Sequence, residues 1–125
     1  MRQFCTYHDG DRCVGWVVEP FVLALRLKLP VFRMLMLSVN DVPCEANGTS
    51  QTTGPIIVAE YDPIVLLIDG RNRVAAARAA GHTMIWAAVF TAEFAEACRI
   101  PDKAALLIVR EAPEISKIEI SNGPH

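Results

Sequence analysis

The stretch from Ile64 to Gly81 constrains the fold more than any other part of this chain. It begins with five branched apolar residues, 64–68, a run that is short for a helix and has no polar alternation, so we expect a strand covered on both faces. Asp69 and Gly70 follow, and then comes a segment of alanine and arginine, both strong helix formers. Gly81 stands where a left-handed helix C-cap is typical. The stretch therefore predicts a buried strand, a tight turn and a helix.

The predicted helix, residues 71–80, begins directly after Asp69 and Gly70. The first N–H groups of a helix lack intrahelical partners and its dipole is positive there, so this turn is a candidate anion site. Arg71 and Arg73 strengthen that hypothesis, because a guanidinium group binds phosphate or carboxylate through two parallel hydrogen bonds. Plainer roles stay open: the arginines are solvated, one of them pairs with Asp69, or Asp69 caps the helix.

The same residues carry a resemblance to a known family. Residues 68–77, Ile-Asp-Gly-Arg-Asn-Arg-Val-Ala-Ala-Ala, followed by Gly81 and an apolar strand, resemble the Asp-Gly-x-x-Arg-x-x-Ala-Ala motif of the ParB/sulfiredoxin superfamily. The resemblance spans about residues 34–90. It implies an α+β domain, with a mixed sheet and flanking helices, that binds a nucleoside triphosphate with Mg²⁺. The residues that the resemblance assigns to the phosphates are Gly70, Arg71, Asn72 and Arg73.

Two departures from the family motif narrow the expected chemistry. In partition proteins the turn reads Gly-Glu-Arg-Arg, so Gly70 and Arg73 agree with it while Arg71 and Asn72 differ. In sulfiredoxin the third position is the catalytic cysteine, and here it is Asn72. Without a thiolate there is no nucleophile to attack an oxidised substrate, so sulfiredoxin chemistry is excluded.

Length and composition predict one globular domain over residues 1–125. The chain is 52% hydrophobic and 21% charged, and it is long enough to bury a core without disulfides or metals. We expect the core in about residues 31–90, C-terminal helices in about 91–113, and a flexible tail at 121–125. Four widely spaced cysteines and no signal-peptide pattern predict buried, reduced thiols in a cytoplasmic protein. No uncharged run is long enough to span a membrane.

A net charge of −2 argues against a protein whose main partner is the DNA backbone. Local patches keep DNA open as a partner, because two groups of basic residues lie close together in the sequence. These are Arg71, Arg73 and Arg78, and, earlier in the chain, Arg26, Lys28 and Arg33.

Outside the motif, the pattern predicts a hairpin around His8-Asp9-Gly10-Asp11, with Trp16 in the core. Residues 20–29 are ambiguous: Pro20 permits a helix, but four leucines at alternate positions favour a strand. Residues 40–53 read as a loop, whose Ser50, Thr52 and Thr53 are either ligands of a phosphate or base, or surface residues. Further strands are expected at 31–39, 54–60 and 84–90, with helices from Thr91 to Arg99 and from Asp102 to Glu111.

The strand at 84–90 should return beside the motif strand through a right-handed parallel crossover. His82 lies at the far end of the helix, about 15 Å from Gly70 at 1.5 Å per residue, which makes it a poor candidate for the same site.

The leading hypothesis is a slow nucleoside triphosphatase or phosphotransferase. Gly70 would let phosphate approach the backbone, Arg73 with Arg71 would offset its charge, and Asn72 would donate a hydrogen bond. Asp69 would act as the catalytic residue and hold the metal or a water molecule. Two alternatives stay open: a ParB-like nuclease or DNA-associated plasmid or phage accessory protein, and a non-catalytic module that binds a partner or a second copy through its apolar C-terminal helix.

Overall fold

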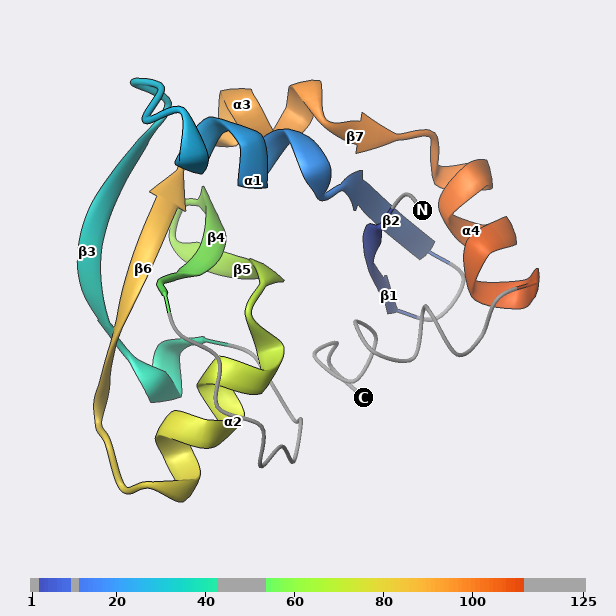
Figure 1. Cartoon of the computed structure of the whole chain (residues 1–125). Helices are drawn as coiled ribbons and strands as arrows, with labels where there is room; N and C mark the ends of the chain where they lie inside the picture. Colours follow the sequence, from blue (N-terminus) through green and yellow to red (C-terminus); the bar gives the residue numbers. More distant parts are fainter. Residues whose placement is uncertain (1–2, 10–11, 43–53, 112–125) are drawn as a thin grey trace.

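The computed structural model describes residues 3–9, 12–42 and 54–111, with side chains for residues 3–7, 13–42 and 54–107. These residues form a small mixed α+β domain with two β-sheets and four α-helices (Figure 1). The predicted α+β class is confirmed. The predictions for the loop at 43–53, including Ser50, Thr52 and Thr53, and for the C-terminal tail lie outside the described residues.

The first sheet contains the predicted N-terminal hairpin. Strands β1 (Phe4–Asp9) and β2 (Arg12–Val17) are antiparallel, and the short strand β7 (Arg99–Ile100) pairs with the other edge of β2. Helix α4 (Asp102–Glu111) packs against β2, where it buries Ala105. The predicted helix from Asp102 to Glu111 is therefore confirmed, and its apolar surface is partly covered within the chain.

The second sheet contains the motif strand and has the order β3-β6-β4-β5. Its strands are β3 (Phe32–Ser38), β4 (Ile56–Tyr61), β5 (Ile64–Asp69) and β6 (Met84–Phe90). All four strands were expected from the sequence. Strand β6 is parallel to β4, whereas β3–β6 and β4–β5 are antiparallel pairs.

The predicted parallel crossover is wrong. Strand β6 lies beside β4 rather than beside β5, so β5 and β6 run in opposite directions. The connection between β4 and β5 is only two residues long, which places β4 against one edge of β5. The free edge of β4 then receives β6, and its Ile56 and Val58 join Ala87 and Val89 of β6 in one buried cluster.

The segment at 20–29 was expected as a strand but forms helix α1 (Glu19–Arg26). Pro20 lies in the first helical turn, where its missing N–H removes no hydrogen bond. The buried face consists of Phe21 and Ala24, at helical spacing, whereas Leu23 is 52% exposed. The alternating leucines were misleading because most of them do not contribute to the core.

The observed ends of two other helices agree more closely with those predicted from the sequence. The hydroxyl of Thr91 accepts a hydrogen bond from the N–H of Phe94 at 3.1 Å and caps α3 (Ala92–Ala97), as predicted, although this helix ends two residues before Arg99. Helix α2 (Arg71–Ala79) is terminated by Gly81, which has φ of +79° and follows the C-cap residue, as the sequence also predicts. The N–H of Gly81 donates to the carbonyl of Arg78 and that of His82 donates to Ala77, the pattern of a Schellman C-cap.

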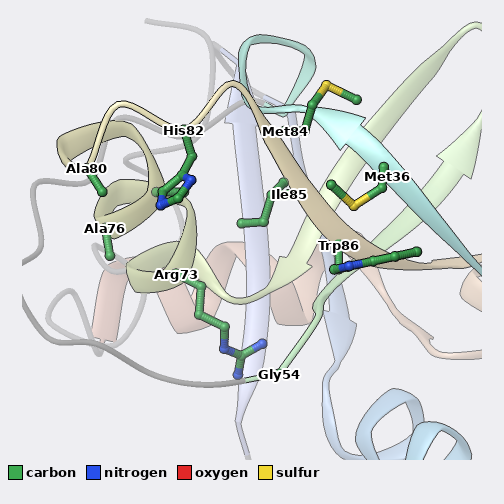
Figure 2. A pocket seen from close by; sticks show the side chains of 10 residues that line it. Met36, Gly54, Arg73, Ala76, Ala80, His82, Met84, Ile85 and Trp86 are labelled. Carbon is green, nitrogen blue, oxygen red and sulfur yellow. The ribbon is translucent and has the colours of Figure 1, made fainter.

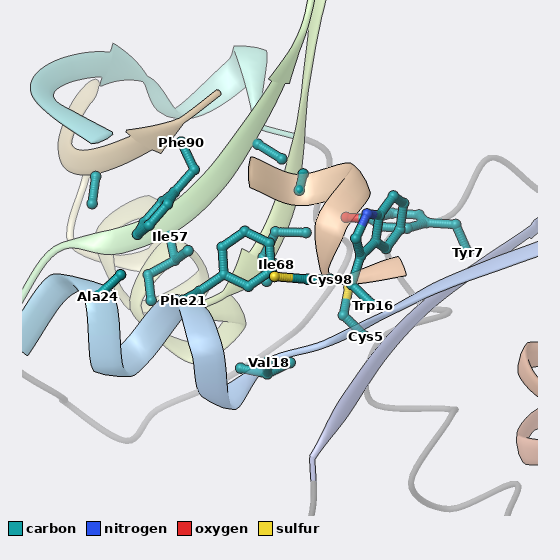
Figure 3. Close-up of a cluster of buried hydrophobic side chains, with 13 residues drawn as sticks. Cys5, Tyr7, Trp16, Val18, Phe21, Ala24, Ile57, Ile68, Phe90 and Cys98 are labelled. Atoms are coloured by element: carbon teal, nitrogen blue, oxygen red, sulfur yellow. The ribbon is translucent and has the colours of Figure 1, made fainter. Parts of the chain in front are cut away.

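Two buried clusters cover the two faces of the second sheet. Ile68 of β5 belongs to the cluster under α1 and α3, and Leu67 belongs to the cluster under α2, so the motif strand is covered on both faces as predicted. Figure 3 shows that Cys5, Tyr7 and Trp16 of the first sheet join the first cluster. The hydroxyl of Tyr7 and the thiol of Cys5 both donate to the carbonyl of Leu67. The two sheets therefore share one core.

Burial of the cysteines agrees with the prediction within the described residues. Cys5, Cys13 and Cys98 are free thiols and all three are buried. Cys44 lies outside the described part of the chain. No helix among the described residues is long and apolar enough to cross a membrane.

Candidate anion site and adjoining pocket

The turn between β5 and α2 requires a glycine for structural reasons. Gly70 is the N-cap residue of α2 and has φ of +111°, which side-chain-bearing residues rarely adopt. A Cβ atom at this position would lie 2.7 Å from Cγ2 of Ile56 and 3.1 Å from its Cα. Close packing of the turn against the start of β4 thus accounts for Gly70 without any ligand.

Asp69 and Arg73 form an ion pair across this turn. Nη2 of Arg73 lies 3.8 Å from Oδ2 of Asp69, and the two side chains are 22% and 25% exposed, respectively. Nη1 of Arg73 also donates a hydrogen bond to the carbonyl of Pro55, which precedes β4. The N-cap residue of α2 is Gly70, which has no side chain, and the interaction observed for Asp69 among the described residues is its pair with Arg73 rather than a helix cap.

The other predicted phosphate ligands lie in the same helical turn but in different surroundings. Arg71 is the first residue of α2 and is partly buried, whereas Asn72 is exposed. The backbone of Gly70 is buried. The turn therefore presents Asn72 to solvent and holds the remaining groups closer to the protein.

Two of the basic residues grouped in the sequence bind partners within the fold. Nη2 of Arg78 donates to the carbonyls of Val39 and Val42, each at 2.9 Å, and so ties α2 to the short 3₁₀ helix η1 (Val39–Asp41). Arg33 pairs with Glu60 through contacts of 3.0 and 3.1 Å. These two arginines support the fold, and their charges are not concentrated around the motif turn.

A pocket of about 400 Å³ runs along α2 to the start of β6 (Figure 2). Arg73 is the one predicted site residue that lines it. His82, which follows the far end of the helix from Gly70, lines the same pocket. The remaining lining residues are Met36, Gly54, Ala76, Ala77, Ala80, Met84, Ile85 and Trp86.

The pocket results from a short neighbouring strand and a helix face of small side chains. Strand β4 begins at Ile56, opposite Ala87, so its pairing with β6 leaves out residues 84–86. Those three residues pair with β3 on their other side. Across from them α2 presents alanines at positions 76, 77 and 80, which fill little space.

Exposed apolar side chains lie on one side of this pocket. Trp86 and Met36 are directly opposite each other in the β3–β6 pair and are 55% and 43% exposed, and Met84 is 44% exposed. Trp86 also lines a second hollow of about 480 Å³, together with Met34, Gly54 and Pro55. The sequence placed these residues on strands but gave no indication that their side chains would be exposed.

The site contains few acidic side chains. Among the described residues no group of three or more His, Cys, Asp or Glu side chains is arranged to hold a metal ion. Asp69 is a single carboxylate at the turn, so a Mg²⁺ ion there would need oxygen ligands from a bound phosphate and from water.

Comparisons of the chain with protein-family models, with curated proteins and with solved structures found no match.

Proposed function

We propose that this chain is a ParB/sulfiredoxin-like domain that binds a nucleoside triphosphate at the β5–α2 turn. The observation that carries the proposal is the position of Arg73. Its guanidinium is held by the carbonyl of Pro55 and by Asp69, and it lines a pocket large enough for a small ligand.

An arginine held in this way is well suited to an anion. Because neighbouring groups already restrict its rotamers, it loses little conformational entropy when a phosphate binds. With 22% of its side chain exposed, it is reachable by a ligand but partly removed from water, which strengthens its interaction with charge. The N-terminal end of α2 adds a favourable dipole beside it.

The remaining predicted ligands have supporting roles in this proposal. Asn72 is exposed and donates from its amide to a phosphate oxygen, and Arg71 adds positive charge at the first position of the helix. Asp69 holds Mg²⁺ together with the phosphates, or orients the attacking water. With one carboxylate in the site, we propose slow hydrolysis or transfer of the terminal phosphoryl group.

A compact ligand is favoured over a DNA duplex. A duplex requires several cations spread along its backbone. Here Arg33 is paired with Glu60 and Arg78 is bound to two backbone carbonyls. We therefore propose a nucleotide as the ligand rather than the backbone of DNA.

The test is calorimetric titration of the four ribonucleoside triphosphates, each with Mg²⁺, into the wild type, Arg73→Ala and Arg73→Lys. We expect binding that is lost in Arg73→Ala and weakened in Arg73→Lys, which keeps the charge but not the planar fork. Arg33→Ala is the matched control, because it also breaks an arginine–carboxylate pair but lies outside the pocket. Absence of binding to the wild type at millimolar ligand would overturn the proposal, and so would equal binding by wild type and Arg73→Ala.

A further inference from the structure

Three exposed apolar side chains meet at one end of the pocket that Arg73 lines. Trp86 and Met36 are paired across β3 and β6, and Met84 lies two residues before Trp86, on the same face of the sheet. Each is more than 40% exposed. Leaving an indole and two thioethers in water is unfavourable, so this end of the pocket favours an apolar, flat group.

The side of the pocket formed by α2 and the residues after it carries two basic side chains among the alanines. Arg73 belongs to α2 and His82 follows that helix, whereas Trp86 belongs to β6. Figure 2 shows Arg73 extending from α2 towards Gly54, whereas the indole of Trp86 extends from β6 away from α2. Ala87 and Val89 of β6 belong to the cluster under α2, so alternation puts Trp86 on the opposite face of β6, and the pocket extends from the cation around the edge that β4 leaves unpaired to the aromatic ring.

Trp86 lines two adjoining hollows. It lines both the 400 Å³ pocket and the adjoining 480 Å³ hollow, and Gly54 is the other residue common to the two. A ring with open space beside it can be covered by a second flat ring without displacement of its neighbours. Stacking of a nucleic-acid base on an aromatic side chain is worth about 1–3 kcal/mol and does not depend strongly on which base it is.

We infer that Trp86 is the base-stacking residue of this pocket, with Met36 and Met84 packing around the edge of the base. The inference rests on the proposed nucleotide site and adds the position of the base to it. A purine covers more of the indole than a pyrimidine does, so ATP and GTP bind more tightly than CTP and UTP.

The experiment compares ATP with inorganic tripolyphosphate, which carries the same phosphate chain without a base or sugar. Both are titrated with Mg²⁺ into the wild type, Trp86→Ala, Trp86→Phe and Leu35→Ala. Leu35 is a matched control, because it is an exposed apolar residue of β3 that lines neither hollow. Since Trp86 is 55% exposed, its variants are expected to fold.

The expected result is a loss of ATP affinity in Trp86→Ala on the order of tenfold or more, partial recovery in Trp86→Phe, and unchanged tripolyphosphate binding in every variant. Leu35→Ala should bind both ligands as the wild type does. If Trp86→Ala binds ATP normally, the stacking inference fails while the phosphate site stands. If it loses both ligands equally, Trp86 acts on the shape of the pocket and the inference also fails. If the wild type binds neither ligand, the proposed function fails as well.

Discussion

The guanidinium of Arg73 lies 3.8 Å from the carboxylate of Asp69, four residues earlier, across the turn that joins β5 to α2. The pair joins the last residue of the motif strand to the first turn of the motif helix. The pair also places the guanidinium of Arg73 next to the Asp69 carboxylate, which is the group that a bound Mg²⁺ would need. In the proposed function Asp69 would influence phosphate binding in two opposite ways, by offsetting the charge of Arg73 and by attracting a metal.

Asp69→Asn separates these two effects. Without Mg²⁺ the variant should bind tripolyphosphate a few-fold more tightly than the wild type, because a partly exposed ion pair offsets roughly 0.5–1 kcal/mol of charge interaction. With Mg²⁺ the variant should lose most of the gain that the metal gives the wild type, and phosphate release from ATP should fall. Calorimetry with and without chelator, together with a phosphate-release assay, checks both. Turnover equal to that of the wild type would remove Asp69 from the mechanism.

Gly70→Ala should destabilise the fold by roughly 2–4 kcal/mol. The new Cβ would clash with Ile56 at 2.7 Å and the residue would be held at φ of +111°, so backbone strain and overpacking both contribute. Gly81→Ala is the matched control, because φ there is +79° and nothing lies within 4 Å of an added Cβ. It should lose only about 1–2 kcal/mol. Urea unfolding measures both, and equal losses would contradict the close packing of Gly70.

Arg78→Met should lower the free energy of unfolding by about 2–4 kcal/mol. The change removes two charge-assisted hydrogen bonds to the carbonyls of Val39 and Val42, two residues that are almost fully buried. Arg26→Met, at an exposed position in the last turn of α1, should lose less than about 1 kcal/mol. Thermal and urea denaturation distinguish the two variants. An unchanged stability in Arg78→Met would mean that the hydrogen bonds of Arg78 contribute no more than those of a surface charge.

The raised pKa of Tyr61 predicts a loss of stability in alkaline solution. Burial, and then the hydrogen bond that its hydroxyl donates to Glu96 at 2.6 Å, raise the pKa of Tyr61 to about 12. Because the folded state favours the neutral phenol, this contribution is complete below the unfolded pKa of about 10 and is lost as the pH rises towards about 12. The free energy of unfolding should therefore decline through that interval.

Tyr61→Phe provides the check on that decline. The variant should be less stable at neutral pH by about 1–3 kcal/mol, because the buried indole N–H of Trp16 loses its acceptor, 3.1 Å away in the wild type. Its stability should also fall less steeply between about pH 10 and 12, since one of the titrating groups is gone. Unfolding by urea at a series of pH values gives both quantities. An equally steep fall in the variant would mean that other groups cause it.

Local features of the fold were predictable because they depend on few neighbouring residues. Gly81 and Thr91 end and begin helices through backbone contacts within one turn, and both were expected. The hairpins β1–β2 and β4–β5 also follow from short connections between apolar runs. The strand order was harder to predict, because β6 is apolar throughout and its sequence does not specify whether it pairs with β4 or with β5.

Helix α1 and the pocket were missed for related reasons. In α1 the leucines dominate the pattern, but the buried positions are those of Phe21 and Ala24. In α2 the alanines at 76, 77 and 80 were interpreted only as helix formers, although their spacing after Arg73 places them on one helix face. That spacing was the available indication of a groove. The contribution of His82 and Trp86 depends on where β4 begins, which the sequence alone does not specify.

The most direct test of the central claim is the location of phosphate on the protein in solution. We would titrate ¹⁵N-labelled protein with magnesium tripolyphosphate and follow the amide resonances by nuclear magnetic resonance. We predict that the largest shifts occur at Gly70, Arg71, Asn72 and Arg73, and that they disappear in Arg73→Ala but persist in Arg33→Ala. Shifts concentrated elsewhere, or none at millimolar ligand, would contradict a phosphate site at the β5–α2 turn.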